Sequence, residues 1–311
     1  MRIIVTLLAS LGIITSAAAK QRVVLISVDG LMGTLVEKGY TPNIKAVAEK
    51  GNYTFQANSV LPPKTIPAHA SMLTGLKPQD HKMINNSYNG KSKIAVKTIF
   101  DFLKAKNPRL ITAAVVGKLK LANILSKNGS VDHSSTPIKE DKYNPKKWGS
   151  ILMRMANYRP YQEVIKDATL TIKSHDPDFL FVHFADVDWM GHWYGGWDKY
   201  HQYIYGLFVD HAIGQIVSLL EQKDPKMLET TIIITADHGG HGSDHGVEGL
   251  HGGKINTSRP ELLNYGMFHP EDYLIPLVAY GPGYVGGTKI KSQKFLTDIP
   301  AMIAKQFGFT W

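Results

Sequence analysis

Several short apolar runs in this chain end in acidic or imidazole side chains, and this feature constrains the fold more than any other. The residues that follow three such runs are Asp29, Asp188, His192, Asp237 and His238. Continuous β-branched runs are typical of buried strands, and ligands of open α/β sheets bind at the carboxyl ends of the strands. Acids and imidazoles gathered at one edge need a cation between them. The sequence therefore predicts a metal-centred hydrolase.

Strand-like and helix-like segments alternate along the chain. Strands are expected at 22–28, 110–116, 179–184, 230–235 and 274–279, and helices at 41–50, 94–104, 161–174, 200–222 and 298–307. The segment 130–149 is rich in Lys, Ser, Asp and Pro without periodicity, so it is expected to be a surface excursion. The alternation indicates an α/β fold with a mostly parallel sheet that helices cover on both faces. No repeat or linker divides residues 20–311, which are expected to form one domain.

The first 19 residues are expected to be a cleaved signal peptide. Arg2 begins the segment, residues 3–14 are mostly apolar, and Ala17-Ala18-Ala19 fits a cleavage site. The run is short for a membrane span of about 20 residues, although an uncleaved anchor is the alternative. No later stretch is long and apolar enough to cross a bilayer. We therefore expect a periplasmic or secreted protein without a transmembrane segment after cleavage.

Composition excludes some chemistries. The chain has no cysteine, so it has neither disulfides nor a thiolate nucleophile, and a zinc site must use His and carboxylate ligands. The formal net charge of +9 could attract anionic substrates or belong to a solvated surface. Its lysines are spread out and form no nucleic-acid-binding motif.

Two polar residues that do not follow a predicted strand, Thr65 and Asn86, each have a local interpretation. Thr65 lies in a proline-rich approach to a helix, where its hydroxyl is either a nucleophile activated by a metal or a plain N-cap. Asn86 stands in Asn85-Asn86, where an Asx-turn is the interpretation that the residues alone offer.

The motifs occur together in a family-specific order. Val28-Asp29-Gly30, the Lys-Thr-x-Pro-x-His segment at 64–69, Thr74-Gly75 followed by His81, the Asp-x-x-Gly-His segment at 188–192 and Asp237-His238-Gly239 follow one another along the chain. This series resembles the nucleotide pyrophosphatase/phosphodiesterase family of the alkaline phosphatase superfamily, from Arg22 nearly to the C-terminus. The resemblance implies an alkaline phosphatase-like three-layer α/β/α sandwich.

The resemblance also implies two divalent metal ions, usually Zn²⁺. One ion takes Asp29, Asp237 and His238 beside the Thr65 oxygen, and the other takes Asp188, His192 and a late His. Asn86 donates a hydrogen bond to a phosphoryl oxygen in the family pattern. The expected late His is His245, followed by Gly246, with His251 as a rival and His241 as a weaker one. An insertion at about 247–268 shifts the register here.

The implied function is hydrolysis of phosphodiester or nucleotide pyrophosphate bonds, through a Thr65 nucleophile and a covalent phosphothreonine intermediate. Its substrate is then a nucleotide or another small phosphodiester. A phosphomonoesterase or phosphonate hydrolase with the same bimetallic site is an alternative, because Thr serves those enzymes too. A metal-stabilised binding protein without turnover is the alternative from another class.

Overall fold

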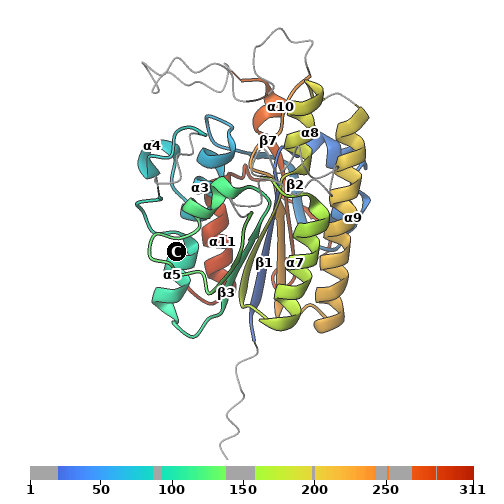
Figure 1. The fold of residues 1–311 in the computed structure, drawn as a ribbon. Helices are drawn as coiled ribbons and strands as arrows, with labels where there is room; N and C mark the ends of the chain where they lie inside the picture. The colour runs from blue at the N-terminus through green and yellow to red at the C-terminus, as the bar shows by residue number, and fades with distance from the viewer. Residues whose placement is uncertain are drawn as a thin grey trace, which may run out of the picture.

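The computed structural model describes residues 20–86, 93–137, 158–197, 200–242, 251, 268–284 and 286–311. Its strands join into one sheet in the order β4-β3-β5-β1-β6-β7-β2-β8 (Figure 1). The strands are β1 (Arg22–Val28), β2 (Asn52–Asn58), β3 (Thr112–Val116), β4 (His133–Ser135), β5 (Phe179–Phe184), β6 (Thr230–Thr235), β7 (Leu274–Tyr280) and β8 (Thr288–Lys289).

The centre of the sheet is parallel, and its strands end at the same level. β1 pairs in parallel with both β5 and β6, and the register sets Val28 opposite Phe184 and Ser27 opposite Thr235. These three strands are buried along their whole length, as their continuous apolar runs predict. The residues that follow them therefore meet at one edge. Only β7 runs against its neighbours, β6 and β2.

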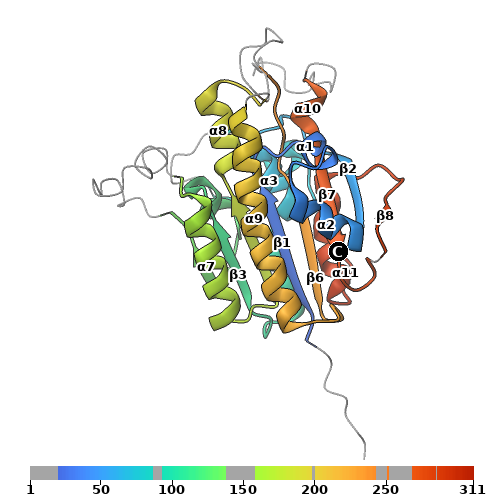
Figure 2. The same cartoon turned by 90° about the vertical axis from the view of Figure 1, so that its right-hand side faces the viewer.

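Helices cover both faces of the sheet, which confirms the expected three-layer α/β/α sandwich (Figures 1 and 2). One face carries α2 (Pro42–Lys50), α7 (Tyr161–Ser174), α8 (Asp186–Tyr194) and α9 (Tyr200–Lys223). The other face carries α3 (Thr65–Thr74), α5 (Ile99–Lys106) and α11 (Ile299–Gln306). Shorter helical segments are α1 (Gly33–Glu37), α4 (Pro78–His81), α10 (Pro270–Tyr273) and the 3₁₀ turns η1 (Leu119–Ile124) and η5 (Leu296–Asp298).

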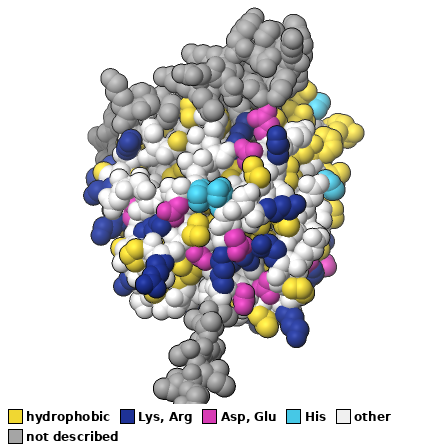
Figure 3. Space-filling model, turned by 60° about the horizontal axis from the view of Figure 1, so that its bottom comes forward, with side chains coloured by type: hydrophobic (Ala, Val, Ile, Leu, Met, Phe, Trp, Pro, Cys, Tyr) yellow, Lys and Arg dark blue, Asp and Glu magenta, His cyan; other side chains and the backbone are white. Residues whose placement is uncertain are grey.

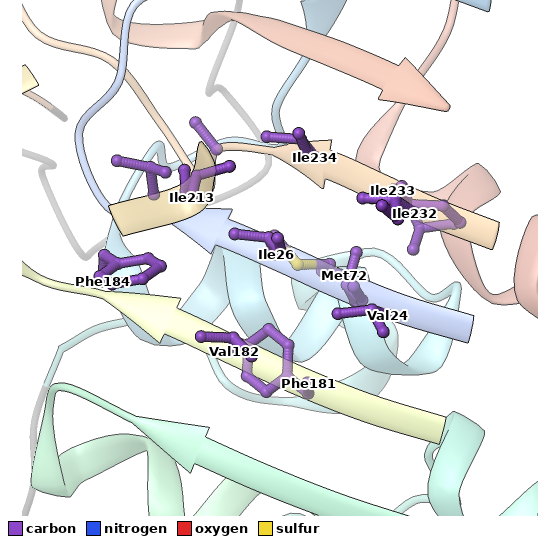
Figure 4. Close-up of a cluster of buried hydrophobic side chains, with 14 of the residues drawn as sticks. Val24, Ile26, Met72, Phe181, Val182, Phe184, Ile213, Ile232, Ile233 and Ile234 are labelled. Carbon is purple, nitrogen blue, oxygen red and sulfur yellow. The ribbon is translucent and has the colours of Figure 1, made fainter. Parts of the chain in front are cut away.

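The core lies between the sheet and these two helical layers. Figure 4 shows apolar side chains of β1, β5 and β6 packed beside one another, with Met72 of α3 and Ile213 of α9 drawn against them. All of the labelled side chains are fully buried. This packing makes the central strands a rigid base for the residues at their ends.

Three details differ from the sequence-based expectations. The helix expected from Ile94 begins only at Ile99, because the Thr98 hydroxyl and the Asp101 carboxylate form a capping box there. The edge strand β4 lies inside the expected excursion 130–149, of which 138–149 fall outside the described residues. The strand β2 has no counterpart among the strands expected from the sequence, because its polar residues interrupt the apolar pattern.

Among the described residues, one helix is long and apolar enough to cross a membrane by length and composition, so the expectation that no later stretch meets this criterion is wrong. This helix is α9, and it packs against α2, α7 and α8. Val209, Ile213, Ile216 and Leu220 on this helix are buried by that packing. We therefore interpret α9 as a core helix of the sandwich.

At the end of the sheet opposite to the carboxyl ends of β1, β5 and β6, Asp176 forms a cluster of salt bridges. Its oxygens lie 2.7 Å from Lys20 Nζ and 2.6 Å from the Arg22 guanidinium. Burial acts to raise the pKa of Asp176, but the basic neighbours outweigh it and lower the pKa to about 2. On the face shown in Figure 3, the basic and acidic side chains of the described residues are interspersed and form no basic stripe there.

Candidate metal centre

The expected acids meet at the carboxyl ends of the central strands. Asp29 follows β1, Asp237 follows β6, and Asp188 lies in the first turn of α8 after β5. Two hydrogen bonds link the segments that carry them. The Asp188 amide donates to the Asp29 carbonyl at 2.9 Å, and the Gly30 amide donates to Asp237 Oδ1 at 3.2 Å. All three carboxylates are at most 1% exposed. Buried charges at this density require a cation or further hydrogen bonds.

One group of ligand atoms converges in front of β1 and β6. His238 Nε2 lies 3.4 Å from Asp29 Oδ1 and 3.3 Å from Asp237 Oδ2. None of these three atoms has a hydrogen-bond partner among the described residues, although all are buried. Bonds of about 2.1 Å in a tetrahedral zinc site separate neighbouring ligands by about 3.4 Å. The group therefore fits a metal ion in spacing, charge and chemistry.

A second group surrounds Asp188 Oδ1, which is also buried without a partner in the described chain. His192 Nε2 lies 3.4 Å and His251 Nε2 lies 3.3 Å from this oxygen, and the two nitrogens are 2.9 Å apart. Asp188 and His192 reach each other across one turn of α8. His238 Nε2 lies 3.8 Å from the same Asp188 oxygen, so the two groups adjoin.

Backbone carbonyls orient two of these imidazoles. His238 Nδ1 lies 2.8 Å from its neighbour's carbonyl oxygen, and His251 Nδ1 lies 2.9 Å from the Pro63 carbonyl oxygen. A carbonyl only accepts, so both Nδ1 atoms carry the proton and both Nε2 atoms present a lone pair. Burial lowers the pKa of His238 to about 3, which keeps this lone pair available.

The three carboxylates do not ionise equally. Burial and the neighbouring Asp29 raise the pKa of Asp237 well above its ordinary range. Burial acts in the same direction on Asp29 and Asp188, but the Lys118 ammonium and the neighbouring histidines together outweigh it and hold both pKa values below the ordinary range. Full ionisation of the cluster therefore needs positive charge beyond that of Lys118.

Thr65 begins α3 at the edge of this cluster. Its side chain is 1% exposed, and Lys64, rather than Thr65, occupies the N-cap position, so the plain N-cap interpretation is wrong. Asn86 Oδ1 accepts a hydrogen bond of 2.9 Å from the Ile66 amide in the first turn of α3. The Asn86 side chain is therefore attached beside Thr65, and its amide donors remain for other partners.

Lys118 is the residue that sequence reasoning missed. It follows β3 by two positions, is 1% exposed, and places Nζ 2.7 Å from Asp29 Oδ2 and 2.5 Å from Asp188 Oδ2. The same nitrogen lies 3.3 Å from Thr65 Oγ1. Like the acids, Lys118 lies just after a strand, and this position is visible in the sequence. A lysine is not a typical metal ligand, however, so its position alone does not indicate a role.

Two more histidines lie under the acids, and sequence reasoning assigned them no role. His183 Nδ1 accepts from the Gly117 amide at 3.2 Å, so its Nε2 donates to Asp29 Oδ2 at 3.0 Å. His69 donates from Nδ1 to the Thr65 carbonyl at 2.8 Å and its Nε2 lies 3.0 Å from Ser27 Oγ. Asp29, His69 and His183 are spaced closely enough for a metal ion, but these bonds occupy the imidazole nitrogens. We interpret both as supports of the site.

The expected site residues are thus largely brought together. Asp29, Asp237 and His238 form one group, Asp188 and His192 contribute to the other, and Thr65 with Asn86 lies beside them. His251, the rival late histidine, lies in the second group, whereas His245 is outside the described residues. His241 lies in neither group in the described structure and instead places Nδ1 2.7 Å from Asp272 Oδ1.

A three-layer sandwich with acids and imidazoles at its strand ends defines an alkaline phosphatase-like hydrolase fold. The sequence signature of the type I phosphodiesterase / nucleotide pyrophosphatase family matches residues 23–256, and the chain belongs to this family. The family predicted from the motifs is therefore confirmed.

Curated relatives agree with this assignment. The chain is 27% identical over 231 residues to bis(5'-adenosyl)-triphosphatase ENPP4 of Bos taurus, covering 72% of this chain and 49% of the relative. It is 28% identical over 233 residues to venom phosphodiesterase 2 of Crotalus adamanteus, covering 70% of this chain and 26% of the relative. The chain spans about half the length of the first of these relatives and less of the second.

Solved structures share the fold. A murine ectonucleotide pyrophosphatase/phosphodiesterase 5, described as inactive and in complex with AMP, matches with a TM-score of 0.66 at 14% identity. That match covers 93% of this chain and 96% of the other. The protein Ps i-CgsB, in complex with k-i-k-neocarrahexaose, matches with a TM-score of 0.64 at 17% identity, covering 94% of this chain and 73% of the other. At these identities the likeness concerns the fold alone.

Proposed function

We propose that this protein hydrolyses phosphodiester or nucleotide pyrophosphate bonds with two divalent metal ions and Thr65 as the nucleophile. The observation that carries the proposal is the position of the buried Thr65 hydroxyl at the start of α3, 3.3 Å from the Lys118 ammonium that contacts one carboxylate of each ligand group. Family membership and the names of the relatives support the same reaction class.

The residues present fit two zinc ions. Asp29, Asp237 and His238 would hold one ion, and Asp188 with His192 and a late histidine would hold the other, each set combining carboxylate and imidazole ligands. Bound there, the metals would supply Lewis acidity for the nucleophile and for the leaving oxygen. Ligands without sulfur suit zinc in a chain that lacks cysteine.

The chain's own residues carry the covalent chemistry. Thr65 gives up its hydroxyl proton to solvent, its Oγ forms a bond to phosphorus, and the leaving oxygen departs with the electron pair of the bond that breaks. A water molecule then attacks phosphorus, its oxygen stays on phosphorus, the bond to Thr65 Oγ breaks, and the proton that the water loses is balanced by the one that Thr65 regains. One water is consumed overall. Asn86, anchored through Oδ1 on the Ile66 amide, directs its amide donors to a nonbridging phosphoryl oxygen.

His251 is our proposal for the late histidine. Its Nε2 lies within 3.3 Å of Asp188 Oδ1 and 2.9 Å of His192 Nε2, and its Nδ1 is held by the Pro63 carbonyl. This combination of a converging lone pair and a fixed tautomer is typical of a metal-ligating imidazole. His245, the residue that the family pattern favours, remains the competing candidate.

We also propose that the protein is exported to the periplasm or secreted after cleavage following Ala19. The basic start, apolar stretch and small residues of the first 19 positions support this. N-terminal sequencing of the protein from intact cells tests it, since a mature chain that retains residue 1 contradicts cleavage.

A substrate panel tests the reaction class. Zinc-loaded protein is assayed with a bis-aryl phosphodiester, a nucleotide aryl ester and an aryl phosphate monoester, and the values of kcat/KM are compared. We expect the two diesters to be preferred. A preference for the monoester would move the assignment to the phosphomonoesterase alternative, and no turnover of any substrate would favour a binding protein.

Thr65→Ala tests the nucleophile, with Thr65→Ser as the matched variant that keeps the hydroxyl. We expect the alanine variant to lose at least about 10³-fold in kcat while keeping its zinc, because it lacks the attacking oxygen but none of the ligands. The serine variant should retain measurable turnover. Wild-type turnover by Thr65→Ala at normal zinc content would contradict the assignment.

A further inference from the structure

Lys118 has an unusual position for a lysine. Its ammonium is buried at the junction of the two groups of ligand atoms, and the ring of Tyr158 lies 4.8 Å from Nζ. An ammonium has three N–H donors, and the oxygens around this one include Asp29 Oδ2, Asp188 Oδ2 and Thr65 Oγ1, with the Tyr158 side chain as a further hydrogen-bond partner. The two shorter contacts tie one carboxylate from each group together, and the contact of 3.3 Å reaches the oxygen of the proposed nucleophile.

Lys118 and the metal ions do not compete for the same atoms. The lysine contacts Oδ2 of Asp29 and of Asp188, whereas Oδ1 of each residue is the buried oxygen without a partner that faces the imidazoles. Each carboxylate can thus bind the ammonium with one oxygen and a metal with the other. The lysine is compatible with a loaded site.

We propose that Lys118 is a catalytic residue, a cation of the protein itself that holds the Thr65 oxygen and stabilises the negative charge on it during phosphoryl transfer. This inference rests on the proposed role of Thr65. Charge develops on Thr65 Oγ when its proton leaves, and again when the phosphothreonine bond breaks. A fixed, buried donor at 3.3 Å acts on both occasions without reorganisation.

The position of Lys118 is itself fixed by the fold. Lys118 follows the buried strand β3 by two positions. The amide of the neighbouring Gly117 donates to the His183 carbonyl at 3.0 Å, and the Gly117 carbonyl accepts from the Arg159 amide at 2.9 Å. The ammonium cannot leave the cluster without breaking two short contacts to carboxylates. The donor is therefore preorganised before substrate arrives.

Lys118→Met tests the proposal, because it removes the charge and retains an unbranched apolar side chain. Lys104→Met is the matched control, since it removes another lysine that pairs with an aspartate, Asp132 at 2.8 Å, away from the site. For zinc-loaded wild type and both variants we measure zinc content, kcat and KM on the bis-aryl phosphodiester, and the Kd of inorganic phosphate by calorimetry.

We expect Lys118→Met to lose about 10²-fold in kcat with a KM within about threefold of wild type and full zinc content. Inorganic phosphate, which would occupy the same position beside Thr65, should bind about tenfold more weakly. The control should match wild type in all four measurements. These results support direct action on the reacting oxygen.

Two results overturn the proposal. One is an unchanged kcat together with an unchanged phosphate Kd in Lys118→Met. The other is a loss of kcat that accompanies loss of zinc and disappears when zinc saturates the site, because Lys118 would then only assemble the ligands. If wild type turns over no phosphoester, the proposed function fails separately, and an unchanged phosphate Kd in Lys118→Met still refutes the role of the lysine.

Discussion

Gly30 holds the two ligand groups at their observed separation, and replacing it by alanine should disturb both. Gly30 has a φ of +78°, and a Cβ there would lie 2.9 Å from Asp188 Cα and 3.0 Å from Asp188 Cβ. The methyl group would therefore meet the backbone that carries Asp188, which cannot rotate away. Gly129 has a φ of +74° with nothing within 4 Å of its ideal Cβ, so Gly129→Ala is the matched control.

The two substitutions share the backbone strain and differ in the clash. A left-handed alanine costs about 1–2 kcal/mol, which is the whole effect expected in Gly129→Ala. Gly30→Ala adds about 1–3 kcal/mol for overpacking, giving a total of about 2–5 kcal/mol. Relief of the clash requires Asp188 to move by about 0.5 Å from its contact with Gly30. We therefore expect zinc affinity to fall by at least about tenfold in Gly30→Ala alone.

Urea denaturation of the metal-free proteins gives the free energies of unfolding, and competition with a chelator gives the zinc affinities. The reasoning predicts a larger loss of stability in Gly30→Ala than in Gly129→Ala, and a loss of zinc affinity only in the former. Equal stability losses together with equal zinc affinities would refute it, since the contact with Asp188 would then have no consequence.

Three further predictions concern the supports, the late ligand and the opposite end of the sheet. His183→Phe removes the donor to Asp29 Oδ2 and should weaken zinc binding about 10–100-fold, which chelator competition measures; unchanged affinity contradicts the supporting role. His251→Ala should lose zinc that His245→Ala retains, and the reverse result would make His245 the ligand. Asp176, with its pKa lowered from 3.8 to about 2, contributes stability that is present at neutral pH and lost as pH falls through this range. The full shift corresponds to about 2.4 kcal/mol, reduced to about 1 kcal/mol because the side chain is 40% exposed. Asp176→Asn should therefore lower the free energy of unfolding by about 1 kcal/mol at pH 7 and by only a small part of that at pH 2. Equal differences at both pH values would contradict it.

Local patterns were enough for the central part of the fold. The strands β1, β5 and β6 are mostly apolar and are buried along their whole length, and such runs are recognised directly in the sequence. The strand β2 is not predicted from the sequence, because its polar residues resemble those of a loop and only the pairing with β7 makes it a strand. The start of α5 is predicted too early, because the hydrophobic spacing from Ile94 continues through a segment that is not helical. The capping box at Thr98 determines where the helix begins.

The residue patterns alone establish the fold class, the family and the edge of the sheet at which Asp29, Asp188 and Asp237 meet, because the carboxyl ends of parallel strands lie at the same edge of a sheet. Only the tertiary structure decided that the ammonium of Lys118 lies between two of these acids and beside Thr65. It also decided that His183 supports Asp29 instead of packing in the core. These assignments depend on contacts between strands that are far apart in the chain, and on which face each side chain points to. Neither leaves a periodic or compositional trace in the sequence.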